Sequence, residues 1–178
     1  MVYYLADKRQ ISFSKFKEKN AEILLGNVSS KGNLVQIICY CLMPTHIHLT
    51  LTQLADKGIS KFIGNILSSY SHYFNLKHNR KGPLWEGRFK GGLVKTDEQL
   101  LHLTRYIHLN PVSAYLVDKP GDWKYSSYKE YISKEHCKSS LCNYDNVLDI
   151  QPILYKKFVE DRISYQRELV KIKALIFD

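Results

Sequence analysis

The alternation of apolar and polar positions predicts an antiparallel pair of strands near the middle of the chain. Residues 34–42 (LVQIICYCL) form a nearly continuous apolar run, which is typical of a central strand, and Pro44 interrupts it. Residues 46–53 (HIHLTLTQ) then alternate, so His46 and His48 share one strand face while Ile47 lies on the other. The two runs are predicted to pair as a hairpin.

Two later segments have helical periodicity. The segment that Gly58 opens carries apolar residues at the i, i+3, i+4, i+7 spacing of an amphipathic helix. A second helix is predicted from Asp97 to Asn110, because Thr96-x-x-Gln99 has the capping-box pattern and Pro111 should stop the helix. The apolar positions of the first helix are Ile59, Phe62, Ile63, Ile66, Leu67, Tyr70 and Phe74.

Weaker patterns fill in the rest of the chain. They predict a strand over 1–5, a helix from residue 12 to about 28, a strand over 84–95 and a helical segment beyond 145. The resulting order is that of an α+β fold, a ferredoxin-like antiparallel sheet with helices packed on one face. We therefore predict one domain over residues 1–132 and a C-terminal helical extension over 133–178.

Composition adds a charge preference and a location. With 178 residues, 44% of them hydrophobic, the chain can bury a core, and 26 Lys and Arg against 17 Asp and Glu leave a net charge of +9. That charge favours a polyanionic partner such as nucleic acid, although it could also serve solubility alone. No apolar run is long enough to cross a membrane and no secretory leader is apparent, so a cytoplasmic protein is predicted.

The cysteines do not suggest a zinc site. Neither Cys39 and Cys41 nor Cys137 and Cys142 have the two-residue spacing of a zinc knuckle. Cys39 and Cys41 are predicted to be small buried residues on one strand face.

Side chains suited to phosphate chemistry occur on two of the predicted elements. The imidazoles of His46 and His48 supply half of a divalent metal site, and Tyr106 and Asn110 lie four residues apart on one helical face, with His102 one turn earlier. Two nitrogens and the Asn110 oxygen suit Mg²⁺ or Mn²⁺. The simpler interpretation is a polar strand face beside one more core aromatic.

A basic segment with interleaved aromatic residues follows the first predicted helix. Cationic side chains track phosphates and aromatic rings stack on unpaired bases, so this segment is predicted to bind DNA. A solvated loop with a structural tryptophan is the alternative. The predicted DNA-binding residues are Lys77, Arg80, Lys81, Trp85, Arg88 and Lys90.

Several motifs in register resemble those of a known family. They are Met43-Pro-x-His46-Ile47-His48, the run from Asn75 to Phe89, and Tyr106-Ile107-His108-Leu109-Asn110-Pro111-Val112. Over roughly residues 34–132 the chain resembles the REP-associated tyrosine transposases, single-strand tyrosine transposases of the HUH (histidine, hydrophobe, histidine) nuclease superfamily.

The resemblance implies a catalytic domain over residues 1–132 in which Tyr106 is the nucleophile. Tyr106 would attack a DNA phosphate and form a 5′-phosphotyrosine, with Mg²⁺ or Mn²⁺ held by His46, His48 and Asn110. His102 could contact these ligands and orient them without binding the metal itself. The substrate implied is single-stranded or hairpin DNA, and the protein would be a monomer or homodimer associated with the nucleoid when bound to DNA.

Two other functions stay open from the sequence. The repeated His-x-Thr pattern, in His48-Leu49-Thr50 and His102-Leu103-Thr104, occurs in two-histidine phosphoesterases, but the second copy falls in a predicted helix rather than a strand. A nucleic-acid-binding protein that has lost catalysis would need only the basic aromatic segment.

Overall fold

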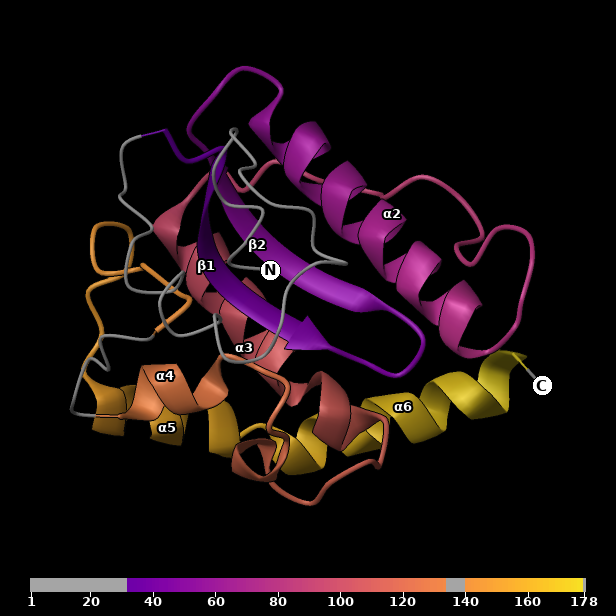
Figure 1. The fold of residues 1–178 in the computed structure, drawn as a ribbon. Coiled ribbons are helices and arrows are strands. Elements are labelled where there is room, and N and C mark those ends of the chain that lie inside the picture. The colour runs from indigo at the N-terminus through magenta and orange to yellow at the C-terminus, as the bar shows by residue number, and fades with distance from the viewer. Residues whose placement is uncertain (1–31, 134–139, 178) are drawn as a thin grey trace. The chain divides into compact units, whose positions relative to one another are not determined.

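The computed structural model describes residues 32–133 and 140–177, the last seven of these by their backbone alone (Figure 1). The predicted strand over 1–5 and the predicted helix over 12–28 lie outside the described residues. The described elements are β1 (Val35–Leu42), β2 (Ile47–Gln53), α2 (Gly58–Lys77), α3 (Asp97–Ser113), the short 3₁₀ helix η4 (Pro120–Asp122), α4 (Tyr128–Ile132), α5 (Pro152–Glu160) and α6 (Ile163–Phe177).

The predicted hairpin is present, with β1 and β2 paired in an antiparallel two-stranded sheet. A tight turn joins them, in which the Met43 amide donates to the His46 carbonyl at 2.9 Å. On its other edge, β1 forms an isolated antiparallel bridge between Cys41 and Ser126. Trp123 anchors this segment, because its indole N–H donates to the Leu42 carbonyl at 3.0 Å. The fold is therefore α+β in the described residues, and a ferredoxin-like topology is not shown.

One predicted strand is wrong. Residues 84–95 form irregular structure without strand pairing. Glycine weakens a strand because it has no side chain to pack and loses much backbone entropy, and this segment holds Gly87, Gly91 and Gly92. Local side-chain packing also holds the segment, since the Trp85 indole N–H donates to the Leu67 carbonyl of α2 at 3.1 Å.

The end of α3 also differs from the prediction. The helix continues through Pro111 to Ser113, and Thr96 caps its start by accepting from the Gln99 amide at 3.1 Å. A proline lacks an amide proton, so it removes one backbone hydrogen bond, but in the last helical turn this loss leaves little helix to disrupt. The Leu116 amide instead closes the end by donating to the Pro111 carbonyl at 2.9 Å. Asn110 therefore lies inside the helix rather than at its end.

The chain divides into two compact units, and the first contains α2. Its described residues are 32–36 and 51–93. Phe62 is fully buried, and the other apolar positions of the predicted α2 stripe are half-buried apart from the exposed Tyr70. Gly58 is required where α2 begins, because a Cβ at this position would lie 2.1 Å from the Leu34 carbonyl oxygen.

The second unit holds residues 37–50 and everything described from 94 onward. Within it α5 and α6 both contact α3, and α4 contacts α5 (Figure 1). Cys39 and Cys41 are buried in β1, as predicted, and burial raises the pKa of the Cys41 thiol to about 12. The division of the chain at residue 132 stays a prediction.

His108 is a buried hydrogen-bonding centre of the second unit. Its Nδ1 lies 2.7 Å from the Tyr155 hydroxyl of α5, and its Nε2 lies 2.8 Å from the Ser127 hydroxyl and 3.3 Å from Cys39 Sγ of β1. Burial lowers the pKa of His108 from 6.5 to about 3, so the ring is neutral in the folded protein. This one side chain ties α3 to the strand and to the helices that follow.

The buried ring makes stability depend on pH. Because the folded pKa of His108 is below the unfolded value, the unfolded chain takes up a proton that the folded chain excludes as the pH falls from 6.5 towards 3. We expect the free energy of unfolding attributable to His108 to fall by about 1.4 kcal/mol per pH unit in that window and to be constant above it. Urea unfolding at pH 7.0 and at mildly acidic pH measures this. A His108→Leu variant, less stable at pH 7, should show a shallower decline, and equal slopes would contradict the assignment.

Candidate metal and nucleophile site

The two histidines of the hairpin lie at the start of β2. His46 is the last residue of the turn and His48 is the second residue of the strand. Their ring centroids are 4.8 Å apart with the planes at 90°. Thr45 Oγ1 lies 3.0 Å from His46 Nδ1, so this contact engages Nδ1 and leaves Nε2 available. The tight turn therefore brings two imidazole rings together and orients one of them.

His48 has a buried nitrogen without a partner. Among the described residues, nothing forms a hydrogen bond with its Nε2 atom. Burial of the ring lowers the pKa of His48, the neighbouring His46 lowers it further, and hydrogen bonding by the Asn110 side chain acts in the opposite direction. A lowered pKa keeps the imidazole neutral, which is the form that binds a metal ion.

Tyr106 and Asn110 approach this pair from α3. The Tyr106 ring lies edge-to-face with His48, with 5.8 Å between ring centroids, and 49% of its surface is exposed. The Asn110 amide nitrogen donates to the Tyr106 carbonyl at 2.8 Å, as the four-residue spacing on one helical face allows. This bond engages the nitrogen of the amide, so the oxygen is the atom of Asn110 suited to binding a metal ion.

All four side chains belong to the second unit of a single chain. The sequence spacing predicts each pair separately, and the structure brings the pairs together through the His48–Tyr106 ring contact. The arrangement combines two imidazole nitrogens, an amide oxygen and an exposed phenol hydroxyl.

Comparison with known proteins confirms the family that the motifs resemble. The model of the family described as "Transposase IS200 like" matches residues 1–110, more than half of the 178-residue chain. The chain belongs to the IS200-like transposase family. The matched residues include His46, His48, Tyr106 and Asn110, whereas α4, α5 and α6 lie beyond them.

A relative in Haemophilus influenzae is named as a REP-associated tyrosine transposase. It is 28% identical over 111 residues, a match that covers 56% of this chain and 62% of the relative. No solved structure matches the chain.

His102 lies one turn before Tyr106 in this IS200-like transposase, but its side chain contacts Arg105 and Phe158 rather than the metal-site residues. Its Nδ1 lies 2.7 Å from the Arg105 guanidinium, and its ring contacts Phe158 of α5 with 5.6 Å between centroids. No sequence pattern could predict the contact with Phe158, because the two residues are far apart in the chain. No contact among residues 32–133 and 140–177 joins His102 to the metal ligands, so its supporting role stays a prediction.

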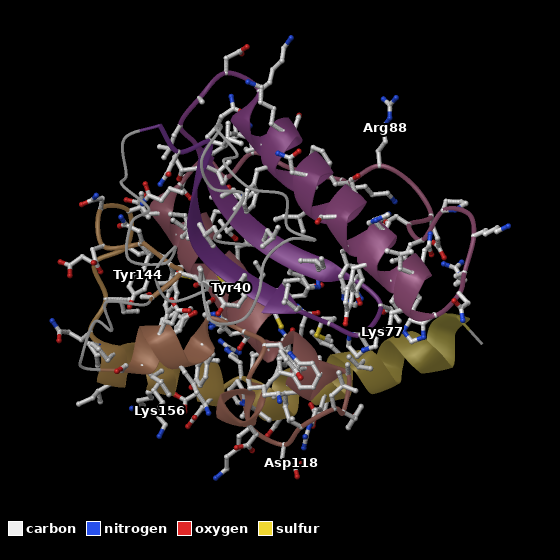
Figure 2. The ribbon with its side chains drawn as sticks, viewed as in Figure 1. Tyr40, Lys77, Arg88, Asp118, Tyr144 and Lys156 are labelled. Atoms are coloured by element: carbon white, nitrogen blue, oxygen red, sulfur yellow. The ribbon has the colours of Figure 1, made fainter. Side chains whose placement is uncertain are left out.

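The predicted DNA-binding residues belong to the first unit and follow α2. Figure 2 shows Lys77 near the end of α2 and Arg88 projecting from the loop beyond it. Arg80 is held in place by the Asn75 side-chain oxygen and the Pro83 carbonyl, each 3.3 Å away. The cationic residues that are exposed are Lys77, Arg80, Lys81, Arg88 and Lys90.

Trp85 differs from these residues because the fold holds its side chain in place, and its role in DNA binding stays a prediction. It is half-buried, its N–H is bonded to α2, and its ring lies 5.9 Å from that of Tyr70 between centroids. The aromatic surfaces of this unit that remain about half exposed are instead Tyr70, Tyr73 and Phe89. The sequence analysis predicted Trp85 as the aromatic residue that contacts DNA. The residue pattern could not show that the fold holds this ring in place while other rings stay more exposed.

Two features are absent from residues 32–133 and 140–177. No helix in these parts of the chain has the length and apolar character needed to span a membrane. No group of three or more His, Cys, Asp or Glu side chains there is placed to hold a metal ion. The candidate set of His46, His48 and Asn110 differs from such a group because its third ligand is an amide oxygen.

Proposed function

We propose that this IS200-like transposase cleaves and rejoins single-stranded or hairpin DNA, using a divalent metal ion and a phosphotyrosine intermediate on Tyr106. One observation carries the proposal: within one compact unit, His46 and His48 lie beside each other and Tyr106 contacts His48. Family membership supports a role in DNA transposition.

The residues present fit a divalent metal ion. The buried Nε2 of His48 has no protein partner in the described residues, which is costly for a buried polar atom unless something binds it. His46 Nε2 and the Asn110 oxygen complete a set of two nitrogens and one oxygen. A bound Mg²⁺ or Mn²⁺ would supply charge stabilisation at the scissile phosphate. Other positions would be filled by phosphate oxygens and water.

Tyr106 would then act as the nucleophile. Its hydroxyl oxygen attacks the phosphorus, the bond from phosphorus to the 3′ oxygen breaks, and the proton that the phenol loses is balanced by the one gained by the departing 3′-hydroxyl. The product is a 5′-phosphotyrosine. Attack by a 3′-hydroxyl reverses the step and rejoins a strand without an external energy source. Exposure of about half of the Tyr106 side chain leaves room for DNA to reach it.

DNA binding is proposed to use the basic segment of the first unit. Each Lys or Arg that neutralises a phosphate releases counterions, so affinity should fall steeply with salt. Arg88→Ala and Lys81→Ala should each weaken binding about three- to tenfold near physiological salt, with metal affinity unchanged. Fluorescence anisotropy with a labelled hairpin or single-stranded oligonucleotide, measured at several salt concentrations, tests this.

A matched control for these variants is Lys156→Ala, an exposed lysine of α5 in the other unit (Figure 2). It removes the same charge and should change affinity less. Equal affinity of the wild type for blunt duplex and for single strands at every salt concentration would contradict the preference for unpaired DNA.

A protein that binds DNA without cleaving it is the main alternative, and the covalent-adduct experiment below separates the two. The two-histidine phosphoesterase has less support. Thr104 of the second His-x-Thr copy is fully buried and its hydroxyl donates to the Leu101 carbonyl at 2.9 Å. A threonine held in this way cannot contact a phosphate.

A further inference from the structure

Two arginines and a histidine gather where α3 meets the end of α5. The Arg105 guanidinium lies 4.1 Å from the centre of the Phe158 ring, and His102 contacts both of these residues. Arg162 follows Phe158 by four residues. Burial lowers the pKa of Arg105, and the charge of Arg162 lowers it further. His102 and Arg162 are exposed and Arg105 is half-buried. These three residues, His102, Arg105 and Arg162, are called the α3 cation cluster below.

The cluster has not been neutralised by a carboxylate in the described residues. The ion pair found there joins Arg167 to Asp118 at 2.9 Å, and Arg105 and Arg162 take no part in it. The acids nearest in sequence are Glu98, Glu160 and Asp161. Glu160 accepts a hydrogen bond from the Tyr128 hydroxyl at 3.1 Å. Holding two guanidinium groups near each other without a carboxylate costs energy, which a bound anion would offset.

The hydrogen bond between Arg105 and His102 fixes what the cluster can bind. A guanidinium has only donors, so His102 Nδ1 must accept, and its proton then lies on Nε2. The cluster therefore offers N–H donors on all three side chains. Two of these are planar guanidinium groups, which match the geometry of phosphate oxygens.

We propose that the α3 cation cluster binds a phosphate of the DNA backbone other than the one that is cleaved. The proposal rests on the proposed function and adds a binding site to it. Arg105 is next to Tyr106 in sequence, and His102 lies four residues before it, a rise of about 6 Å along the helix. Held there, the strand would be aligned at the nucleophile by a contact in the same compact unit as the metal ligands.

A purely structural role for Arg105 is the competing explanation, because its contact with Phe158 joins α3 to α5. The test therefore centres on Arg162, which is exposed at the junction of α5 and α6. Its ring contact is with Tyr165 in the first turn of α6, at 5.6 Å from the ring centre, and does not involve α3. Loss of the Arg162 charge should leave the packing of α3 against α5 intact.

Arg162→Gln and the control Lys156→Gln are compared in the full-length protein. The Lys156→Gln substitution removes the same charge. Lys156 lies on α5 two residues from Phe158, about 200° around the helix. Binding of a single-stranded oligonucleotide is measured by anisotropy across a salt series. We expect Arg162→Gln to weaken binding about fivefold and to reduce the salt slope by about 0.7, as for one lost phosphate contact on a single strand, with Lys156→Gln within about twofold of wild type.

Cleavage kinetics give a second measurement. Arg162→Gln should raise KM for DNA with kcat within about twofold, because saturating DNA restores occupancy of the site. Arg105→Gln should behave similarly, and a thermal melt of each variant shows whether folding has changed. Equal effects of Arg162→Gln and Lys156→Gln on affinity and salt slope would overturn the proposal.

The outcome is separable from that of the proposed function. If wild-type protein forms a Tyr106 adduct but Arg162→Gln binds like the control, cleavage stands and the phosphate site is wrong. If no adduct forms yet Arg162→Gln alone loses a phosphate contact, the phosphate site stands and the cleavage mechanism is wrong. If wild-type protein does not bind DNA, both are wrong.

Discussion

Tyr106→Phe is expected to abolish covalent attachment of the protein to DNA while leaving DNA and metal binding close to wild type. The substitution deletes one oxygen and keeps the ring that contacts His48. Because about half of the Tyr106 side chain is exposed, losing the hydroxyl leaves no buried group unsatisfied. Removal of a covalent nucleophile eliminates the step it performs, so cleavage should fall by on the order of 10⁴-fold or more.

The measurement is a denaturing gel of labelled single-stranded DNA incubated with protein and Mn²⁺ or Mg²⁺, followed by mapping of the modified peptide. Matched controls are needed because the chain has thirteen tyrosines. Tyr73→Phe and Tyr125→Phe are suitable, since those side chains are 50% and 47% exposed, close to the 49% of Tyr106. Both should form the adduct normally. An adduct that persists in Tyr106→Phe and maps elsewhere would falsify the assignment.

If Tyr106→Phe instead loses DNA binding altogether, Tyr106 is structural. If wild-type protein forms no adduct with any single-stranded or hairpin substrate while binding them tightly, the non-catalytic DNA-binding alternative is correct. The experiment thus distinguishes a nucleophilic Tyr106, a structural Tyr106 and a protein that binds DNA without cleaving it, which the motifs alone do not.

The parts of the fold that were predicted correctly are those with strong local periodicity. The β1–β2 hairpin and the starts of α2 and α3 follow from alternation, a glycine and a capping box, all of which act over a few residues. The failed strand over 84–95 shows the opposite case. Its apolar residues suit a strand, but its three glycines weaken one, and the Trp85 bond to α2 depends on a residue eighteen positions earlier.

The candidate site divides in the same way. Spacing predicted that His46 would adjoin His48 and that Tyr106 would adjoin Asn110, and both pairs are in contact. Nothing in the pattern could show that the pairs meet within one chain, because that depends on how α3 packs behind β1.

His108 controls much of that packing, and its role could not be predicted from the sequence. The residues that surround it, Cys39, Ser127 and Tyr155, come from separate segments that only the folded chain brings together. The same holds for the α3 cation cluster, where Arg162 lies sixty residues from His102.

His48→Ala is expected to remove metal-dependent cleavage without destabilising the fold. As a ligand, His48 supplies one of two imidazole nitrogens, and its loss should lower metal affinity and cleavage by about 10²-fold or more. The effect of His48→Ala on the free energy of unfolding distinguishes a metal ligand from a structural histidine. Replacement would end the hydrogen bonding between His48 and the Asn110 side chain, but the buried Nε2 of His48 has no partner among the described residues. Removing an unsatisfied buried atom should therefore leave stability within about 1 kcal/mol of wild type, or raise it.

Thermal melts with and without Mn²⁺ measure both properties together, because an ion that binds the folded state alone raises Tm. Wild-type protein should gain Tm with Mn²⁺, and His48→Ala should not. Thr52→Ala is the matched control, since Thr52 is exposed on the same face of β2 and should leave the metal response unchanged. The metal response should weaken as the pH falls, because a protonated imidazole does not bind a metal ion, and the lowered pKa of His48 keeps that ligand neutral to a lower pH than an ordinary histidine. Normal cleavage by His48→Ala, together with an unchanged Mn²⁺ shift, would place the metal elsewhere, whereas a large loss of Tm without metal would mean that His48 supports the fold rather than the reaction.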